Sequence, residues 1–172
     1  KELEAEFDFT VYCSSIYKKN DRIKSYNKSK LIFLPFKANG IQSIFYDIIS
    51  TFHAWFTSDI LLVLGPAAGF LFPLNKFFKK KIITNHGGLN EWEREKLSLF
   101  QRKYAYFNHK IAGQNSNENI ADNIPLKESL FRTFGIKTKV IEYGGNHINI
   151  QNISSKTLKK YFENIKNEKF GE

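Results

Sequence analysis

The sequence predicts an α/β fold built on a parallel sheet, and three observations lead to this class. Short apolar runs rich in β-branched residues alternate along the chain with segments whose apolar residues recur at helical spacing. Most of the strand-like runs are continuously apolar, which is typical of strands in a parallel sheet that is covered by helices on both faces. The chain has 172 residues, of which 42% are hydrophobic, so it is long enough for one domain with a real core.

Each predicted element has a local reason. Strands are expected where β-branched and aromatic residues cluster, at 7–13, 30–35, 59–64, 81–84, 119–122 and 139–143. Helices are expected where apolar residues repeat every three or four positions, at 41–52, 66–74, 91–111, 123–134 and 158–165. Asn123 is suited to cap the fourth of these helices, Pro125 is tolerated in its first turn, and Gly135 is suited to end it. The polar stretch 14–29 is expected to be a mobile loop.

The domain organisation follows from the same pattern. We expect one domain over residues 1–150 and a C-terminal helix or linker over 151–172. The chain contains no methionine, and residues 1–5 look like the tail of a helix. These two features predict that the sequence is a piece of a longer protein.

Composition restricts the classes of function. The single cysteine, Cys13, excludes an intrachain disulfide and a cysteine-rich metal site. No apolar run approaches the roughly 20 residues of a membrane span, and no leader pattern is visible, so a cytoplasmic location is predicted. The net charge of +9 favours an anionic partner such as a phosphate-bearing ligand or the inner face of a membrane. Because the lysines are spread along the chain, an ordinary solvated surface explains the charge equally, and no nucleic-acid motif is present.

The most informative segment is 84–96, where an apolar strand delivers a histidine and two glycines into a predicted helix start. Ligands of open α/β sheets usually sit at such a junction, at the carboxyl end of a strand. Gly87 and Gly88 permit a close approach of the backbone or a positive φ. His86, Glu91 and Arg94 are then expected to line one rim of the site.

Several motifs in order along the chain resemble one known family. They are Thr-Val-Tyr-Cys, Asp-Ile-Leu-Leu-Val-Leu-Gly, Asn-His-Gly-Gly-Leu-Asn-Glu-Trp-Glu-Arg-Glu-Lys, Ile-Ala-Asp-Asn and Ile-Glu-Tyr-Gly-Gly-Asn-His. Together they are similar to the N-terminal half of bacterial rhamnosyltransferase-like enzymes, which are retaining glycosyltransferases of the GT-B architecture. The chain departs from the family pattern at Gly87, where an Asp is usual, at the additional Asn90, and at Leu97, where a second Trp is usual.

The resemblance implies a Rossmann-like domain that forms the acceptor-binding half of a glycosyltransferase, without the half that binds the nucleotide-sugar. It also implies that the first strand of this domain is missing from the sequence. It implies that His86 is the catalytic residue that faces the donor sugar. Gly87, Gly88, Glu91, Arg94 and His147 are the implied substrate-binding residues. It implies that a sugar such as rhamnose passes from a nucleotide-sugar to a lipid-linked glycan in surface polysaccharide synthesis. No cofactor, metal or nucleic-acid partner is expected, and this half alone is expected to be inactive.

Less specific interpretations stay open beside these. The chain is alternatively a non-catalytic Rossmann-like module that binds a nucleotide, a sugar or a protein partner. His86 is alternatively a hydrogen-bonded structural histidine, and Glu91 and Arg94 alternatively stabilise the start of a helix. Trp92 is expected to be a packing anchor. His53 and His109 are expected to be ordinary residues of helices, and Asp122 and Asn123 to cap a helix.

Overall fold

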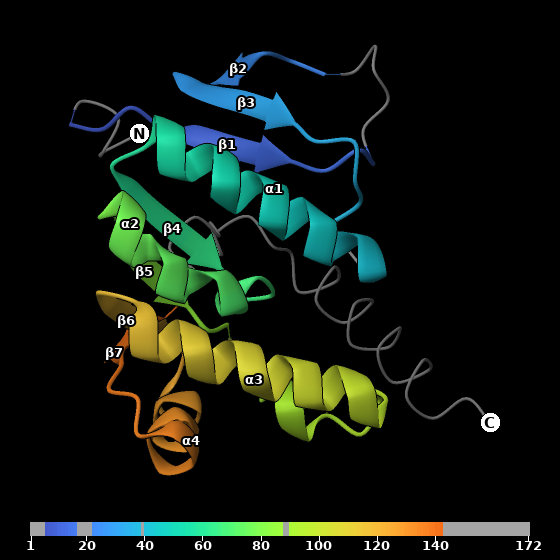
Figure 1. Cartoon of the computed structure of the whole chain (residues 1–172), viewed down its shortest axis with the longest axis vertical. Helices are drawn as coiled ribbons and strands as arrows, with labels where there is room; N and C mark the ends of the chain where they lie inside the picture. Colours follow the sequence, from blue (N-terminus) through green and yellow to red (C-terminus); the bar gives the residue numbers. More distant parts are fainter. Residues whose placement is uncertain (1–5, 17–21, 39, 88–89, 143–172) are drawn as a thin grey trace, which may run out of the picture. The chain divides into compact units, whose positions relative to one another are not determined.

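The computed structural model describes residues 6–16, 22–38, 40–87 and 90–142, and these residues form an α/β fold of the Rossmann-like type (Figure 1). The strands make a three-stranded sheet in the order β1-β3-β2 and a four-stranded sheet in the order β4-β5-β6-β7. The four-stranded sheet is parallel throughout. The strands are β1 (Thr10–Cys13), β2 (Ser25–Tyr26), β3 (Ser29–Phe33), β4 (Ile60–Leu64), β5 (Lys81–Asn85), β6 (Glu118–Ala121) and β7 (Lys139–Val140).

Helices connect the parallel strands. The described helices are α1 (Ile41–Thr57), the 3₁₀ turn η3 (Gly69–Leu74), α2 (Asn75–Phe78), the 3₁₀ turn η4 (Glu91–Glu93), α3 (Leu99–Asn115) and α4 (Ile124–Phe134). The predicted class, an α/β fold with a parallel sheet, is therefore confirmed. No helix among these residues is both long enough and apolar enough to cross a membrane.

The helix predicted at 91–111 begins later than expected. A 3₁₀ turn occupies Glu91–Glu93, and the helix itself starts at Leu99. Ser98 fixes this start through a capping box, because its hydroxyl accepts from the Gln101 amide at 3.3 Å while its own amide donates to the Gln101 side chain at 2.9 Å. The predicted start at the acidic residues is therefore wrong, because the Ser98 cap sets the first turn of the helix.

The polar stretch 14–29 also contains an element that was not predicted. Ser25 and Tyr26 form β2, which pairs antiparallel with β3. Asn27 and Lys28, both at positive φ, make the intervening turn. A strand of two residues carries no periodic signal in the sequence, so its register depends on the neighbouring strand.

The main core lies between the sheet and the helices on one of its faces. Trp55 of α1, Leu61 of β4, Phe72 of η3 and Ile82 of β5 pack in one cluster with Ala112 of α3. A second cluster joins Ala121 of β6, which lies on the same face as Ile82, to Leu126 and Leu130 of α4. The described helices therefore cover this face, whereas the outward side chains of β4 remain exposed.

Candidate functional site

The carboxyl ends of β4, β5 and β6 lie next to one another because the three strands are parallel neighbours. Gly65 follows β4, His86 and Gly87 follow β5, and Asp122 follows β6. The strand-to-loop junction that the sequence singled out is therefore at the edge of the sheet where ligands of open α/β folds usually bind.

Asn85 holds two of these strand ends together. Its amide nitrogen donates to Asp122 Oδ1 at 2.9 Å, and its Oδ1 accepts from the backbone amide of Gly87 at 2.8 Å. Gly87 adopts a φ of +77°, and a Cβ added there would meet nothing within 4 Å. The glycine is thus required for the turn, and the space beside its backbone is open among the described residues.

His86 lies in the interior, with an exposed fraction of 2%. Its Nε2 is 3.0 Å from Asn119 Oδ1, and its Nδ1 is 3.0 Å from His109 Nδ1. Asn119 donates its own amide nitrogen to the Gly113 carbonyl at 3.0 Å, so its oxygen must face His86. His86 therefore carries its proton on Nε2, and its Nδ1 accepts the proton of His109 Nδ1.

His109 extends the chain of contacts towards the surface. Its Nε2 is 3.5 Å from Glu91 Oε2, and the Glu91 side chain is 51% exposed. Since His109 Nδ1 already donates to His86, an ion pair with Glu91 forms when Nε2 is protonated as well. The network of Asn119, His86, His109 and Glu91 thus joins β6, the loop after β5, α3 and η4. We call it the histidine network.

Burial and neighbours shift two pKa values in the histidine network. Burial lowers the pKa of His86 to about 4, with the Asn119 hydrogen bond opposing this effect and the charge of His109 adding to it. His86 is therefore neutral at pH 7. The contact with His109 holds the pKa of Glu91 below its usual value, burial opposes this shift, and Arg94 adds to it.

The other predicted site residues are distributed differently. Arg94 is exposed, and its amide closes η4 by donating to the Glu91 carbonyl at 3.3 Å. Gly88, His147 and the segment 151–172, together with the predicted boundary at residue 150, lie outside the described residues. Glu91 and His86 are brought together indirectly through His109. The catalytic and substrate-binding roles of all these residues stay predictions.

Trp92 is confirmed as a packing anchor. It is buried, and its ring meets His109 and Phe134 edge-on at centroid distances of 4.9 and 5.0 Å. Its carbonyl accepts from Arg102 Nε at 3.0 Å, which ties η4 to α3. The expected cap is also found, because Asn123 Oδ1 accepts from the Leu126 amide at 2.8 Å.

The residues that organise the site were not predicted from the sequence. His109 was assigned to an ordinary helix position, and Asp122 was expected to cap a helix, whereas it accepts from Asn85. Asn119 and Asn85 were not singled out. The partners lie 23 to 37 positions apart along the chain, and strand order together with the docking of α3 brings them together. The available signals were the adjacency of parallel strand ends and the alternation of side chains along each strand.

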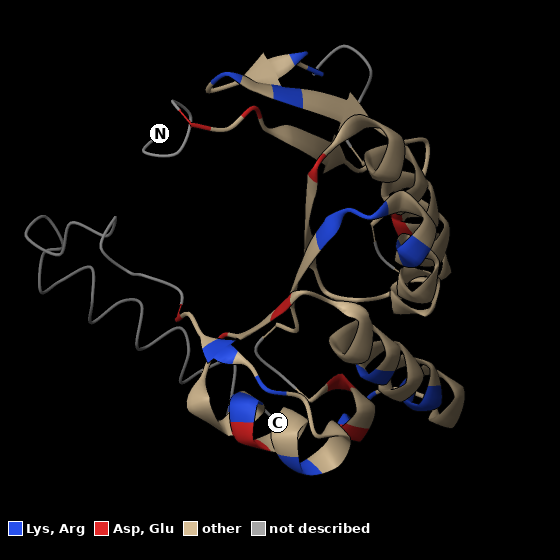
Figure 2. Ribbon diagram, turned by 60° about the vertical axis from the view of Figure 1, so that its left-hand side comes forward, with Lys and Arg blue, Asp and Glu red and all other residues tan. Residues whose placement is uncertain are grey.

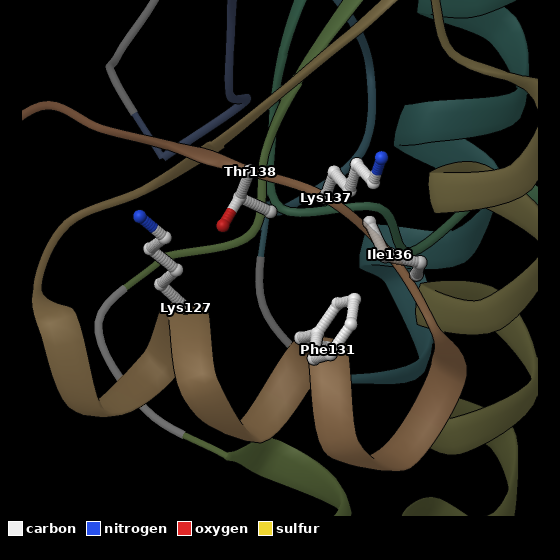
Figure 3. Close-up of a pocket in the computed structure, with 5 residues that line it drawn as sticks. All are labelled: Lys127, Phe131, Ile136, Lys137 and Thr138. Carbon is white, nitrogen blue, oxygen red and sulfur yellow. The ribbon is translucent and has the colours of Figure 1, made fainter.

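The described residues were also searched for metal-ligating groups and for pockets. Among the described residues, no group of three or more His, Cys, Asp or Glu side chains could hold a metal ion. A pocket lies between α4 and the segment before β7 (Figure 3). Its lining residues are Lys127, Phe131, Ile136, Lys137 and Thr138.

Comparison of the chain with models of known protein families and with curated proteins finds no match.

Proposed function

We propose that this chain is the acceptor-binding domain of a glycosyltransferase, with the sugar acceptor held at the carboxyl edge of the four-stranded sheet. The observation that carries the proposal is the open backbone of Gly87, fixed by Asn85 beside the carboxylate of Asp122. Backbone groups, a carboxylate and an amide at one edge are suited to bind the hydroxyl groups of a glycan. The motif resemblance supports the same reading.

Two substrates enter this proposal. The glycan or glycolipid acceptor binds the Gly87 backbone and Glu91, whose carboxylate is half exposed and ionised at pH 7. The nucleotide-sugar donor is held mainly by a second domain outside this chain. Retaining transfer passes through an oxocarbenium-like state, so the contribution of this half is to orient the acceptor next to the donor.

The burial of His86 favours a second candidate, a binding module without catalysis. Both ring nitrogens of His86 are engaged by Asn119 and His109, and its side chain is in the interior. In this arrangement His86 acts on a ligand only through the loop that it anchors. In the glycosyltransferase reading, it is accordingly a residue that positions the loop.

Titration of the ¹⁵N-labelled chain, followed by the shifts of assigned amide signals, tests the proposal. Methyl glycosides and nucleotide-sugars serve as probes. We expect glycosides at millimolar concentration to shift the amides of Gly87 and Asp122, and D122N to weaken this binding about tenfold. D59N is the matched control, because Asp59 lies at the opposite end of β4 and pairs with Lys80.

Each outcome is informative. Shifts caused by glycosides and lost in D122N support the acceptor domain. Shifts caused by a free nucleotide alone favour the non-catalytic module. If neither class of probe moves these amides, or if D59N weakens binding as much as D122N, the site is wrongly placed.

A cytoplasmic location at the inner face of a membrane is the remaining part of the proposal. The net charge of +9 supports it, although Lys and Arg lie on several strands and helices and do not gather on one of them (Figure 2). Co-sedimentation with phosphatidylserine vesicles should therefore weaken steeply with added salt. Vesicle binding that does not depend on salt concentration, or no vesicle binding at low salt, contradicts a membrane role.

A further inference from the structure

The Nε2 atom of His109 is buried and has no hydrogen-bond partner among the described residues. The side chain of His109 is 2% exposed, and Nε2 lies 3.5 Å from Glu91 Oε2. A buried polar atom without a partner costs free energy in a folded protein. The interaction between these two atoms therefore depends on whether Nε2 carries a proton.

The protons of the histidine network are ordered from β6 outwards. Asn119 donates its amide nitrogen to the Gly113 carbonyl at 3.0 Å, so Asn119 Oδ1 accepts from His86 Nε2 at 3.0 Å. His86 Nδ1 then carries a lone pair, which accepts from His109 Nδ1 at 3.0 Å. The orientation of the Asn119 amide thus fixes one proton on His109 Nδ1 and leaves Nε2 as the nitrogen that gains or loses a proton.

The charge of His109 determines how it interacts with Glu91. When His109 is neutral, its Nε2 presents a lone pair to an ionised carboxylate, and the two groups repel each other. When Nε2 is protonated, it donates to Oε2 and the pair attracts. The 3.5 Å separation becomes that of an ordinary hydrogen bond if Glu91, whose side chain is 51% exposed, moves by a few tenths of an ångström.

Packing holds the His109 ring in place while Glu91 moves. The centroid of the ring lies 5.2 Å from that of His86 and 4.9 Å from that of Trp92. Trp92 belongs to η4 and is tied to α3, because its carbonyl accepts from Arg102 Nε at 3.0 Å. A side chain that is locked by its neighbours is suited to orient a more exposed group of a binding site.

Glu91 has a second carboxylate oxygen that a ligand can reach. Within the described residues, the polar contact of its carboxylate is the one between Oε2 and His109, and no hydrogen bond or ion pair to Oε1 is formed. An ionised carboxylate accepts hydrogen bonds on both oxygens. Contact of Oε2 with His109 therefore leaves Oε1 for a hydroxyl group.

We propose that His109 is a positioning residue for Glu91 in the binding of the acceptor. The imidazole with a proton on each nitrogen holds Oε2, and Oε1 then accepts from a hydroxyl group of the glycan. The inference rests on the function proposed above, in which Glu91 contacts the acceptor. Its consequence is that acceptor affinity falls as the pH rises and His109 loses the proton on Nε2.

The other titratable groups around His109 are consistent with this direction. His86 faces it from the loop after β5 and is neutral at pH 7, since burial lowers its pKa to about 4. Glu91 faces it from η4, and the contact with His109 holds the pKa of Glu91 below its usual value, an effect to which Arg94 adds. From β6 the network receives only the uncharged Asn119. Above pH 5.5, His109 is thus the member of the network that changes its charge.

Two variants separate the two contacts of His109. The amide nitrogen of an asparagine side chain occupies the place of Nδ1, so H109N can donate to His86 and cannot reach Glu91. The amide nitrogen of the longer glutamine side chain occupies the place of Nε2, so H109Q can donate to Glu91 without a charge. H53N is the matched control, because His53 is an exposed histidine of α1.

The affinity for methyl glycosides, measured between pH 5.5 and 8.5 from the shift of the Gly87 amide, tests the inference. We expect the wild-type affinity to fall about threefold across this range, and H109N to bind about threefold more weakly than the wild type at pH 5.5. H109Q should restore most of this affinity and keep it at pH 8.5, and H53N should follow the wild type. Since burial raises the pKa of Asp47 to about 6, the effect of His109 is the difference between the wild type and H109N.

The outcomes separate this inference from the proposed function. Equal pH profiles of H109N and the wild type, or H109Q that binds as weakly as H109N, overturn the inference alone. No glycoside binding at any pH overturns the proposed function and the inference together. Should the variants fail to fold, the unmodified chain decides, because the loss of affinity must follow the loss of the His109 Nε2 proton in the ¹⁵N spectrum of the imidazole. Different midpoints for these two curves overturn the inference.

Discussion

Acid is expected to destabilise this domain through His86. The side chain is 2% exposed and its pKa is lowered from the usual 6.5 to about 4. The unfolded chain therefore binds this proton more readily than the folded chain. The contribution of neutral His86 to stability is fully present above pH 6.5, falls as the pH drops from 6.5 to 4, and is lost below that.

The size of the effect follows from the shift. A difference of about 2.5 pKa units corresponds to about 3 kcal/mol in the free energy of unfolding, or about 1.4 kcal/mol for each pH unit within the window. Glu91 affects the free energy of unfolding mainly below this pH window. Its pKa in the folded chain lies below its usual 4.5, so its contribution is present above pH 4.5 and is lost as the pH falls through the lowered pKa. The two groups can thus be separated by pH. Burial also raises the pKa of Asp47 to about 6, and this shift changes stability in the opposite direction over nearly the same pH range. The His86 contribution is therefore measured as the difference between the wild type and a variant without His86.

Urea unfolding at several pH values between 7 and 4 measures the predicted slope, and NMR titration of the labelled imidazoles measures the pKa of His86 directly. The variant H86N should lose part of its stability at pH 7, since Asn119 and His109 lose their partner. Its stability should then rise relative to that of the wild type as the pH falls from 6.5 to 4, because only the wild type loses the His86 contribution. H53N is the control, because His53 is exposed and contacts Tyr12 and Thr57.

An imidazole of His86 that titrates near 6.5 refutes this reasoning, because it shows that water reaches the histidine network. A wild-type slope in H86N has the same consequence. Should H86N fail to fold at pH 7, the imidazole titration of the unmodified chain still decides the matter.

Three further predictions concern single positions, each measured as the free energy of unfolding in urea. G69A should cost about 2 to 3 kcal/mol, because the new Cβ would lie 2.5 Å from the Asn108 carbonyl oxygen and 2.9 Å from Ala112 Cβ. G113A is the control and should cost less, because its new Cβ meets only the side chain of Ile136. Equal costs for the two variants would contradict the rigid packing of η3 on α3. S98A should cost about 1 kcal/mol through loss of the capping box, with S98T close to the native value, and a neutral S98A would show that the box is unimportant. E91Q should cost less than about 1 kcal/mol at pH 7 and low salt, because the Glu91 side chain is half exposed, and a loss independent of salt would point to packing instead of charge.

Much of the fold was accessible from the sequence because its signals are local. The apolar runs located six strands to within a few residues, and the helical repeat located α1 and α4. Gly135 ends α4 at a φ of +71° as expected of a left-handed cap. Two local signals disagreed about the start of α3, the acidic residues at 91–95 and the Ser98 cap. The predicted start at the acidic residues was wrong.

The candidate site was less accessible, because its contacts are not local. The sequence placed His86 at the right junction, and it could not show that His109, 23 residues later, would meet it. The position of His109 over the end of β5 depends on how α3 docks. This docking in turn depends on the close approach of Gly69 to the α3 backbone. Burial of His86 is therefore a property of the assembled core.

Strand parity nevertheless carries a signal that separates Asn85 from His86. Side chains alternate between the two faces of a strand, so Ile82, Thr84 and His86 share one face, and Ile82 and Thr84 are both fully buried. The exposed Lys81 at the start of β5 identifies the other face as the outward one. By this rule His86 points towards the face of the sheet that α3 covers and Asn85 towards the opposite face, where its contacts with Asp122 and Gly87 leave it 9% exposed. The parity of a histidine that follows a strand end therefore predicts which face of the sheet its ring meets, and for His86 it predicts the contact with His109 of α3.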